Sequence, residues 1–530
     1  MQRGKQDNVQ ITPQERSSCQ ALSISRCLFG LRTTGRSSRQ PTGTPADSAM
    51  TDQKYDYDFF VIGGGSGGVR AARVAAQFGA KVALCELKLD AISTDTTGGM
   101  GGTCVLRGCI PKKFMVYAGD FEDEMKDAKG YGWSIPQKPT LNWKTFIGKK
   151  RQELERLSGL YKKNLESAGG HCFEGRGQII DKHTIRVNEK DYKVKHICVA
   201  TGGRPSKPPV EGKELAVVSD HVLDLDDLPK KMVIVGGGYI ACEQACIFHS
   251  LGVETHFVFR QDYVLRGFDQ ECREFVQQQY GVHGMIMHPE NSPAKIEKAD
   301  GKLKVTFDPK KGDKWTLDGV DTVLMATGRH PLTSNIGLEE AGVKLDEKGG
   351  IVVDKHSKTS VDSIWSVGDV TNRIPLTPVA RMEGMCLAHH LFGPKDSKTT
   401  TPDHDVVASV VFSTPNMASV GLSEEAAAQE IKDFEVFSST FTPLKQSLSR
   451  KDVKCLTKLI VDSKSQKVVG VHMVGAEAAE IVQGLAAAIK AGITKHMLDI
   501  TVGLHPTSAE EFVTMWAPKR VYKNGKESKQ

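Results

Sequence analysis

A short glycine-rich loop between an apolar run and a helical stretch constrains the fold of this chain most. Tyr57–Ile62 is a compact apolar run, Gly63-Gly64-Gly65-Ser66-Gly67-Gly68 follows at once, and a helix is expected through about Phe78. Lys81–Cys85 is then predicted as a second strand that ends at Glu86. This order predicts a Rossmann unit, in which the glycines let the backbone approach a pyrophosphate and the acid holds a ribose hydroxyl. A plain glycine-rich turn is the alternative, but the strand, the helix and the acid all lie in register.

A second copy of the pattern follows later in the chain. Met232–Val235 runs into Gly236-Gly237-Gly238-Tyr239-Ile240-Ala241, and the next apolar run, Thr255–Phe259, ends at Arg260 rather than at an acid. Arg260 and Arg266 suit a 2′-phosphate, so we predict NADP(H) rather than NAD(H) in this unit. Two solvated surface arginines are the alternative. The first unit, with its acid, is expected to hold a dinucleotide without that phosphate.

Two similar short stretches lie on either side of the second unit. They are Val199-Ala200-Thr201-Gly202-Gly203-Arg204-Pro205 and Met325-Ala326-Thr327-Gly328-Arg329-His330-Pro331. Their placement predicts that the second Rossmann unit is inserted into the first. A further strand, Ile364–Gly368, ends at Asp369, where an acid can hold a cofactor hydroxyl or simply cap the following turn.

Between the two glycine-rich loops lies Gly101-Gly102-Thr103-Cys104-Val105-Leu106-Arg107-Gly108-Cys109-Ile110-Pro111-Lys112-Lys113. Pro111 suits a first helical turn, and apolar residues recur at helical spacing through Phe121, so Cys109 is expected at a helix N-terminus. The helix dipole and unpaired amides stabilise a thiolate there, and we interpret the cysteine pair as a redox dithiol. The two lysines oppose the dipole, which indicates a functional rather than a stabilising role.

The alternatives for this pair are structural cysteines in an apolar turn and half of a zinc site. A zinc site needs a second Cys or His pair at ligand spacing. The only other close pair, Cys242 and Cys246, lies i,i+4 on an expected core helix, so nothing in the sequence indicates a metal. The 12 cysteines show no disulfide framework, and most are expected to be reduced thiols in an intracellular compartment.

Composition limits the class of protein. At 530 residues, 39% of them hydrophobic and 25% charged, the chain is expected to form three or four soluble globular domains. No apolar run approaches the roughly 18 residues of a membrane-spanning helix. Most of the formal charge of +6 lies in residues 1–50, so basicity does not indicate nucleic acid as a partner. Arg16 to Ala46 contains five arginines and no acid, which is typical of an organelle transit peptide; a generic tail, or a start at Met50, is the alternative.

The last part of the chain alternates strands and helices. Strands are expected at Val406–Phe412 and as a pair over Cys455–Met473, and helices at Glu424–Ile431 and Glu477–Gly492. His505-Pro506-Thr507-Ser508-Ala509-Glu510-Glu511 follows. The histidine is the only residue there suited to proton transfer near pH 7, and the glutamate at 510 can orient its ring. A structural histidine is the alternative.

In their joint order, the two glycine-rich units, the C-x4-C dithiol, the Gly-Asp motif and the terminal His-Pro-Thr resemble the flavoprotein disulfide reductases, from about Tyr57 to Arg520. The resemblance implies an α/β fold with two Rossmann-like dinucleotide-binding domains, for FAD and NADPH, and a C-terminal α+β dimerisation domain. The implied boundaries are 1–54 for a disordered or transit segment, 55–202 and 331–401 for the two parts of the FAD-binding domain, 203–330 for the NADPH-binding domain, 402–520 for the dimerisation domain and 521–530 for a tail.

The resemblance also implies a catalytic set, which comprises Cys104, Cys109, Lys112, Glu243, His505 and Glu510. Electrons would pass from NADPH through FAD to a disulfide between the two cysteines, of which Cys109 faces the flavin and Cys104 attacks the substrate. Lys112 would pair with Glu243 beside the flavin. The histidine would come from the other subunit of an obligate homodimer and would protonate the leaving thiolate.

Two binding sets follow from the same resemblance. The implied cofactor contacts are Gly63, Gly65, Ser66, Gly67, Gly68, Glu86, Thr103, Thr201, Gly202, Asp369, Thr377, Gly236, Gly238, Tyr239, Ile240, Arg260, Arg266 and Gly328. Tyr239 would gate the nicotinamide pocket. The implied substrate contacts are Arg73, Tyr161 and Ser66.

Charge favours glutathione disulfide as the substrate, because its carboxylates outnumber its ammonium groups and require a basic cleft. Arg70 and Arg73 lie three residues apart and share a helix face, which supplies such charge unless it is merely a solvated face. Met385 stands where many family members have a second arginine. Lys112 argues against a dihydrolipoamide dehydrogenase. A trypanothione- or thioredoxin-reductase-like enzyme, or a non-catalytic FAD-binding protein, is the alternative.

The insertion Ile92–Gly101 resembles members of the family from plants, algae and cyanobacteria. It supports the interpretation of the N-terminal segment as a plastid-targeting sequence. We therefore expect a chloroplast protein, with the mitochondrion as a further possibility and the cytosol if translation starts at Met50.

Overall fold

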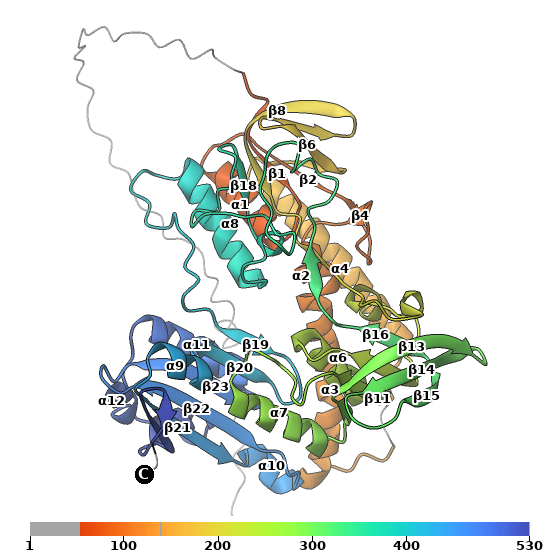
Figure 1. The fold of residues 1–530 in the computed structure, drawn as a ribbon, viewed down its shortest axis with the longest axis vertical. Helices are drawn as coiled ribbons and strands as arrows, with labels where there is room; N and C mark the ends of the chain where they lie inside the picture. Colours follow the sequence, from red (N-terminus) through yellow and green to blue (C-terminus); the bar gives the residue numbers. More distant parts are fainter. Residues whose placement is uncertain (1–53, 138–139, 529–530) are drawn as a thin grey trace, which may run out of the picture. The chain divides into compact units, whose positions relative to one another are not determined.

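The computed structural model describes residues 54–137 and 140–528, which Figure 1 colours along the sequence. The expected transit segment therefore lies almost entirely outside the described residues. The helices are α1 (Ser66–Gln77), α2 (Gly102–Arg107), α3 (Cys109–Ala128), α4 (Trp143–Glu166), α5 (Ser219–Val222), α6 (Tyr239–Ser250), α7 (Gln270–Val282), α8 (Thr377–Phe392), α9 (Glu424–Glu430), α10 (Leu444–Ser449), α11 (Ala478–Lys490), α12 (Lys495–Asp499) and α13 (Glu511–Thr514).

The strands form two Rossmann sheets, one C-terminal sheet and three smaller sheets. They are β1 (Tyr57–Ile62), β2 (Val82–Glu86), β3 (Lys88–Leu89), β4 (Thr97–Gly98), β5 (His171–Glu174), β6 (Gly177–Asp181), β7 (Thr184–Val187), β8 (Lys190–Val199), β9 (Gly203–Pro205), β10 (Lys231–Val235), β11 (Glu254–Phe259), β12 (Ile286–Pro289), β13 (Asn291–Ala299), β14 (Lys302–Pro309), β15 (Trp315–Val320), β16 (Thr322–Met325), β17 (Arg329–Pro331), β18 (Ile364–Ser366), β19 (Ser409–Val411), β20 (Met417–Gly421), β21 (Phe434–Phe441), β22 (Cys455–Asp462), β23 (Val468–Val474), β24 (Arg520–Lys523) and β25 (Lys526–Glu527).

The first Rossmann unit has the strand order β5-β2-β1-β8-β7-β6, and β18 pairs with the C-terminal part of β8. Strand β1 runs parallel to both β2 and β8, with Ile62 opposite Cys85 and Val199. Its residues Phe59, Phe60 and Val61 are fully buried, as expected for a parallel sheet that is covered on both faces. The carboxyl ends of these strands therefore meet at the first glycine-rich loop.

The second Rossmann unit is a parallel sheet with the order β12-β11-β10-β16. An antiparallel sheet of β13, β14 and β15 lies in the chain between β12 and β16 of this unit. The two similar stretches that flank this unit pair with each other as β9 and β17, with Gly203 opposite Pro331 and Pro205 opposite Arg329. The chain thus leaves and re-enters the first unit through adjacent strands, which supports the predicted insertion.

The C-terminal sheet has the order β19-β20-β23-β22-β21-β24-β25 and is antiparallel throughout (Figure 1). The strand expected at Val406–Phe412 is shorter, because only Ser409–Val411 pairs with β20. The predicted tail at 521–530 is wrong for its first part, because β24 and β25 extend the sheet through Glu527 and Tyr522 stacks on Phe434. No helix among residues 54–137 and 140–528 is both long and apolar enough to cross a membrane.

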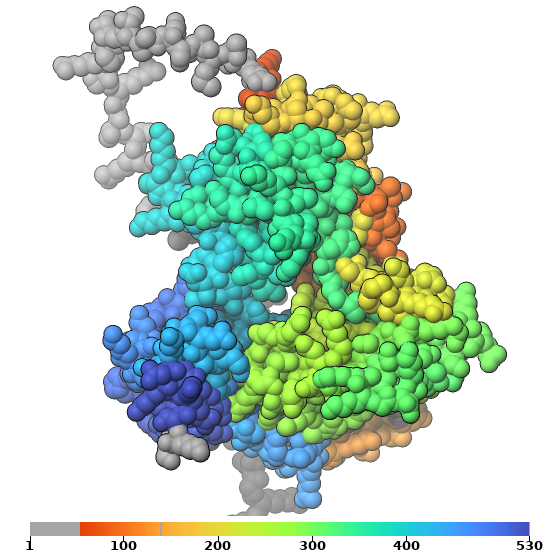
Figure 2. Space-filling view, viewed as in Figure 1, coloured from red at the N-terminus to blue at the C-terminus, as the bar shows by residue number. Residues whose placement is uncertain are grey.

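A buried ion cluster joins the second Rossmann unit to the C-terminal sheet. The Lys458 ammonium is fully buried and lies 2.8 Å from an Asp269 oxygen and 2.5 Å from a Glu424 oxygen. Asp269 caps the N-terminus of α7, while Lys458 lies on β22. In the space-filling view, the yellow-green segment that contains α7 touches the blue C-terminal segment (Figure 2).

Candidate functional site: a dithiol between two dinucleotide-binding loops

The first glycine-rich loop has the geometry of a dinucleotide cradle. Gly63 has φ +109°, and a Cβ there would lie 2.4 Å from the Ala200 carbonyl oxygen. A Cβ at Gly68 would lie 2.0 Å from the Gly63 oxygen, so only glycine allows α1 to pack this closely on the strands. A Cβ at Gly65, in contrast, would have its nearest neighbouring atom 4.0 Å away. That open face beside a helix N-terminus is what close approach of a pyrophosphate to the backbone requires.

Glu86 lies across the turn of this loop. Its carboxylate accepts hydrogen bonds from Gly64 N at 2.5 Å, from Leu87 N at 2.8 Å and from Gly99 N at 3.3 Å. Burial raises the pKa of Glu86, and these amides act in the opposite direction. The acid is thus held beside the cradle, where the sequence placed a ribose ligand.

The second glycine-rich loop repeats this geometry. Gly236 has φ +140°, and a Cβ there would lie 2.3 Å from the Ala326 carbonyl oxygen, whereas a Cβ at Gly238 would meet nothing within 4 Å. Tyr239 and Ile240 begin α6 immediately afterwards. Arg260 and Arg266, at and beyond the end of β11, are both exposed and are free to meet a phosphate that enters from solvent.

The two similar stretches contribute Thr201, Gly202 and Gly328 to the region between the loops. Thr201 donates to the Leu332 carbonyl at 2.7 Å, and Gly202 and Gly328 have positive φ values of +71° and +139°. Arg329, which sequence reasoning did not select, donates to the Thr103 hydroxyl at 3.4 Å. Its position inside the repeated stretch was the signal that could have indicated it.

The Asp369 carboxyl lies near the same guanidinium. Burial raises the pKa of Asp369, and the positive charge of Arg329 acts in the opposite direction. Burial also raises the pKa of the Tyr239 phenol, to about 12, and the charges that act on it include those of Arg329, Glu243 and Asp369. The tyrosine of the second unit therefore faces the site of the first.

The dithiol spans the junction of two helices. Cys104 lies in α2, and Cys109 is the first residue of α3, as the sequence predicted. Gly108 forms the turn between them, where a Cβ would lie 2.8 Å from the Thr103 carbonyl oxygen. Both cysteines are free thiols, as are the other eight cysteines in the described part of the chain. Cys109 Sγ lies 3.6 Å from the hydroxyl of Thr377, the first residue of α8.

The two thiols are electrostatically unequal. A hydrogen bond from the Cys104 thiol is the largest cause that lowers the pKa of Cys109 to about 6; burial opposes it, and Thr377 and Lys112 reinforce it. The same hydrogen bond, together with burial, raises the pKa of Cys104 well above its usual range. The reduced pair is therefore a thiolate at Cys109 and a thiol at Cys104 near neutral pH.

Lys112 and Glu243 form an ion pair beside the dithiol, with 2.7 Å between Nζ and Oε1. Glu243 also accepts a hydrogen bond from Phe412 N at 3.0 Å. The Phe412 ring lies 4.6 Å from the Lys112 ammonium and 4.4 Å from that of Lys113. Both lysines that oppose the helix dipole are thus stabilised by contacts with other parts of the chain, and Phe412 is a residue that sequence reasoning missed.

His505 and Glu510 pair with each other through Nδ1 and Oε1 at 3.0 Å. The histidine side chain is 81% exposed, and the glutamate is 22% exposed. Among the residues that the structure describes, no hydrogen bond or ion pair joins this couple to the dithiol. Within one chain, the structure therefore brings the acid pair together but does not bring it to the cysteines.

The remaining predicted residues gather on the Cys104 side. The Ser66 hydroxyl is within hydrogen-bonding reach of Cys104 and lowers its pKa slightly against the larger effects. Tyr161 on α4 packs against Leu106 and Leu154, and burial, followed by the Cys104 charge, raises its pKa. Arg73 lies half-buried on α1. Ser66 and Tyr161 thus lie near Cys104, and Arg73 lies on the same helix as Ser66.

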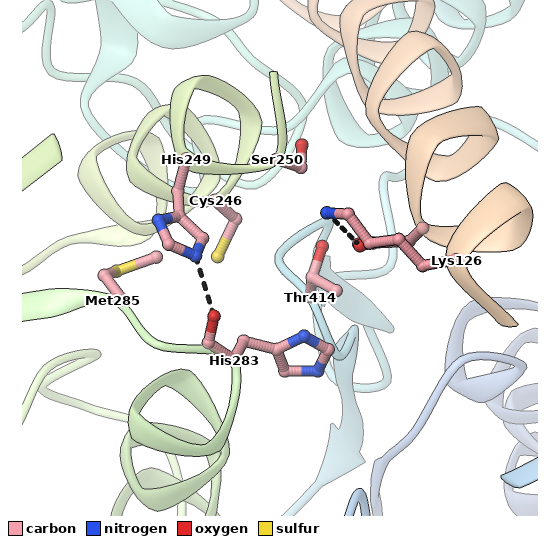
Figure 3. Close-up of a pocket in the computed structure, with 8 residues that line it drawn as sticks. Lys126, Cys246, His249, Ser250, His283, Met285 and Thr414 are labelled. Atoms are coloured by element: carbon pink, nitrogen blue, oxygen red, sulfur yellow. Dashed lines mark hydrogen bonds and ion pairs between the residues drawn. The ribbon is translucent and has the colours of Figure 1, made fainter. Parts of the chain in front are cut away.

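A separate cavity of about 50 Å³ lies among α3, α6 and the loop at Thr414 (Figure 3). Cys246 Sγ faces it, and His249 Nε2 is 2.8 Å from the His283 carbonyl oxygen at its wall. Cys242 and Cys246 are both buried in α6, as expected for core residues. The cavity has room for little more than water and lies apart from the dithiol.

Comparison with known proteins agrees with this arrangement. Residues 57–384 match the pyridine nucleotide-disulphide oxidoreductase family, and residues 407–516 match the dimerisation domain of that family. A chloroplastic/mitochondrial glutathione reductase of Pisum sativum is 50% identical over 88% of this chain and 84% of its own length. The glutathione reductases of Burkholderia cepacia and Nostoc sp. are 45% and 41% identical, each over 87% of this chain and 99% of its own length.

Proposed function

Because the chain belongs to the pyridine nucleotide-disulphide oxidoreductase family, we propose that it is an NADPH-dependent reductase of glutathione disulfide. One observation carries this proposal: the unequal dithiol of Cys104 and Cys109 lies between two dinucleotide-binding loops, beside the Lys112–Glu243 pair. A protein that merely bound FAD would need neither the activated thiolate nor the exposed His505–Glu510 couple.

FAD and NADPH are the cofactors, and both glycine-rich loops fit them. The FAD cradle would be formed by Gly63, Gly65 and Gly68 with Glu86, and Thr103 and Asp369 would lie at the flavin end. Bound FAD supplies the chemistry that converts hydride from NADPH into an electron pair for the disulfide. Tyr239, which begins the helix of the NADPH loop, would cover the nicotinamide pocket.

Thiol–disulfide exchange with the substrate then uses Cys104, Cys109 and His505 in turn. The Cys104 thiol gives its proton to His505, which Glu510 holds, and the resulting thiolate attacks one sulfur of glutathione disulfide; the substrate disulfide breaks, a mixed disulfide forms and one glutathione leaves as a thiolate. His505 returns the proton to that leaving thiolate. The Cys109 thiolate then attacks the Cys104 sulfur, which re-forms the internal disulfide and releases the second glutathione as a thiolate that takes a proton from solvent. Lys112 favours the thiolate at Cys109 throughout.

The chain acts as a homodimer. Several large apolar side chains close to His505 in the sequence are exposed, namely Met497, Ile500, Val502, Leu504 and Trp516. Val502 is 93% exposed and Leu504 76%, and apolar side chains exposed in this way are typical of an interaction surface. A second subunit that covered it would bring one chain's His505 toward the other chain's Cys104, which accounts for the distance between the two groups within a single chain.

The location is organellar, in agreement with the name of the pea relative, and we propose the chloroplast in particular. The basic, acid-free stretch from Arg16 to Ala46 supports this proposal. Residues 1–54 fused to a fluorescent protein should enter plastids, and the same fusion with its five arginines in this stretch changed to glutamine should stay outside. Exclusive entry into mitochondria would contradict the chloroplast assignment.

The enzymatic proposal is tested with purified, FAD-loaded protein. Anaerobic addition of NADPH should produce a long-wavelength thiolate-to-flavin absorbance, and glutathione disulfide should then discharge it. Steady-state efficiency should be higher with glutathione disulfide than with trypanothione disulfide, lipoamide or oxidised thioredoxin. If another disulfide is preferred, the substrate assignment fails; if NADPH never produces the band, the dithiol mechanism fails.

A further inference from the structure

Helices α1 and α8 cross at very close range beside the dithiol. A Cβ at Gly384 would lie 2.4 Å from the Gly67 carbonyl oxygen, and a Cβ at Gly67 would lie 3.1 Å from the Ala380 carbonyl oxygen. The two backbones are therefore in contact, and the side chains that flank the crossing share one surface. On that surface, Arg70 Nη2 of α1 lies 3.6 Å from Met385 Sδ of α8.

Arg381 lies one helical turn before Met385 on α8, so the two side chains share a face of the helix. Arg381 is exposed. Burial lowers the pKa of Arg70, and the charges of Arg381 and Arg73 lower it further, which places three guanidinium groups close together. Arg381 also acts on the Tyr161 phenol, on which Cys104 acts as well. Arg381 and the attacking cysteine therefore both lie near the Tyr161 phenol.

This cluster of Arg70, Arg73 and Arg381 has no internal anion. Within residues 54–137 and 140–528, none of the three forms an ion pair, although salt bridges occupy many other arginines, such as Arg107 and Arg520. Like charges held together are unfavourable unless an anion joins them, and a guanidinium binds a carboxylate with two parallel hydrogen bonds. The cluster is thus suited to a substrate that brings carboxylates of its own.

We propose that Arg381 is a substrate-binding and specificity-determining residue, which with Arg70 holds a carboxylate of glutathione disulfide at the place where the Met385 thioether offers no charge. The inference rests on the proposed function. It assigns a binding role to a residue that neither glycine-rich loop nor the dithiol motif indicates. Because Arg381 lies near Arg70 and Tyr161 and belongs to neither glycine-rich loop, it should affect the disulfide half-reaction alone.

The test replaces Arg381 in the full-length, FAD-loaded enzyme. Arg381→Met should raise KM for glutathione disulfide roughly tenfold or more, as expected for a lost charge-assisted hydrogen bond, and should leave kcat and flavin reduction by NADPH unchanged. Arg381→Lys should recover part of the loss. The matched control is Lys355→Met, which removes the same charge from an exposed position outside the three-arginine cluster.

A second substrate separates binding from a structural effect. Glutathione disulfide esterified at all four carboxylates should show nearly the same KM with wild-type and Arg381→Met enzyme. An equal rise in KM for both disulfides, or no rise for either, would overturn the inference. If the wild-type enzyme turns over glutathione disulfide and Arg381→Met does so with unchanged KM, only this inference is lost; if the wild type turns over none, the proposed function fails with it.

Discussion

Lys112 Nζ and Glu243 Oε1, which are 131 positions apart in the sequence, lie 2.7 Å apart in the structure. Lys112 belongs to the dithiol helix and Glu243 to the first helix of the second Rossmann unit. Their side chains are only 12% and 3% exposed. Because Glu243 also accepts from Phe412 N in the C-terminal part of the chain, one carboxylate links three segments at the active dithiol.

We predict opposite effects on Cys109 from the two partners of this pair. The Lys112 charge lowers the pKa of Cys109 and the Glu243 charge raises it. Lys112→Met should therefore raise that pKa, whereas Glu243→Gln should lower it further, provided that each variant binds FAD. The measurement is the pH dependence of the charge-transfer absorbance in the reduced enzyme. Shifts in the same direction would show that the variants disturb the helix rather than the charge balance.

The charge-transfer absorbance of the wild-type enzyme should persist down to about pH 6. With a Cys109 pKa of about 6, the thiolate is present above that pH and is lost by protonation below it. An unperturbed thiol would lose it well above neutrality. Cys104→Ala removes the donor that most favours the thiolate, so its band should fade at a higher pH than that of the wild type. Cys172→Ala, a substitution on β5 outside the dithiol motif, should have no effect.

The sequence was sufficient for the elements whose signal is local. The positive φ values of Gly63 and Gly236 and the end of β2 at Glu86 follow from residues within a few positions of one another. The position of Cys109 at the start of α3 follows from Pro111 in the same way. Such features depend on backbone sterics and on helix geometry, which a short window of sequence contains.

Contacts between distant segments could not be predicted in this way. Phe412 reaches Lys112, and Arg329 reaches Thr103, only because three sheets are assembled around the site. The apolar period of α3 likewise gave no indication that Phe121 would be 67% exposed. Periodicity predicts which residues share a helix face, but it does not predict whether another part of the chain buries that face. Nothing in the sequence around Arg381 indicates a role, because only the packing of α1 on α8 brings it close to Arg70 and Arg73.

The preference for NADPH should depend on Arg260 and Arg266. Both are exposed and follow the end of β11 in the second Rossmann unit, where a guanidinium can bind the 2′-phosphate through charge-assisted hydrogen bonds. Changing both to alanine should reduce kcat/KM for NADPH by about one to two decades for each bond lost, with little change for NADH. Lys298→Ala, an exposed position on β13, is the control. An unchanged NADPH to NADH ratio would show that the arginines are solvated surface residues.

The buried ion cluster should be a major source of stability. Lys458→Met leaves the carboxylates of Asp269 and Glu424 without their shared cation and should cost about 3–5 kcal/mol, whereas Lys464→Met on the surface should cost little. Burial acts to raise the pKa of Asp269, but His472 and Lys458 outweigh it and lower that pKa to about 2.

The sign of the pH dependence follows from that lowered pKa. The contribution of Asp269 to stability is fully present above its ordinary pKa of 3.8 and is lost as the pH falls toward about 2. The free energy of unfolding of the wild-type protein, measured with denaturant, should fall over that pH window. For Lys458→Met, the free energy of unfolding should already be lower than that of the wild type at neutral pH. Equal unfolding midpoints at neutral pH would contradict a stabilising role for the cluster.

Proton donation by His505 should be separable from flavin reduction. The His505 side chain is exposed and is oriented by Glu510 at 3.0 Å, as expected for a donor that completes its site only in the assembled dimer. His505→Gln should lower turnover of glutathione disulfide by roughly 10² to 10⁴, the range for one positioned proton donor. Glu510→Gln should have a smaller effect, because the imidazole stays in place but loses its anionic partner. Stopped-flow reduction of the flavin by NADPH should be normal in both variants. If His505→Gln also slows that step, the histidine supports the assembly of the site, and the acid role assigned to it is wrong.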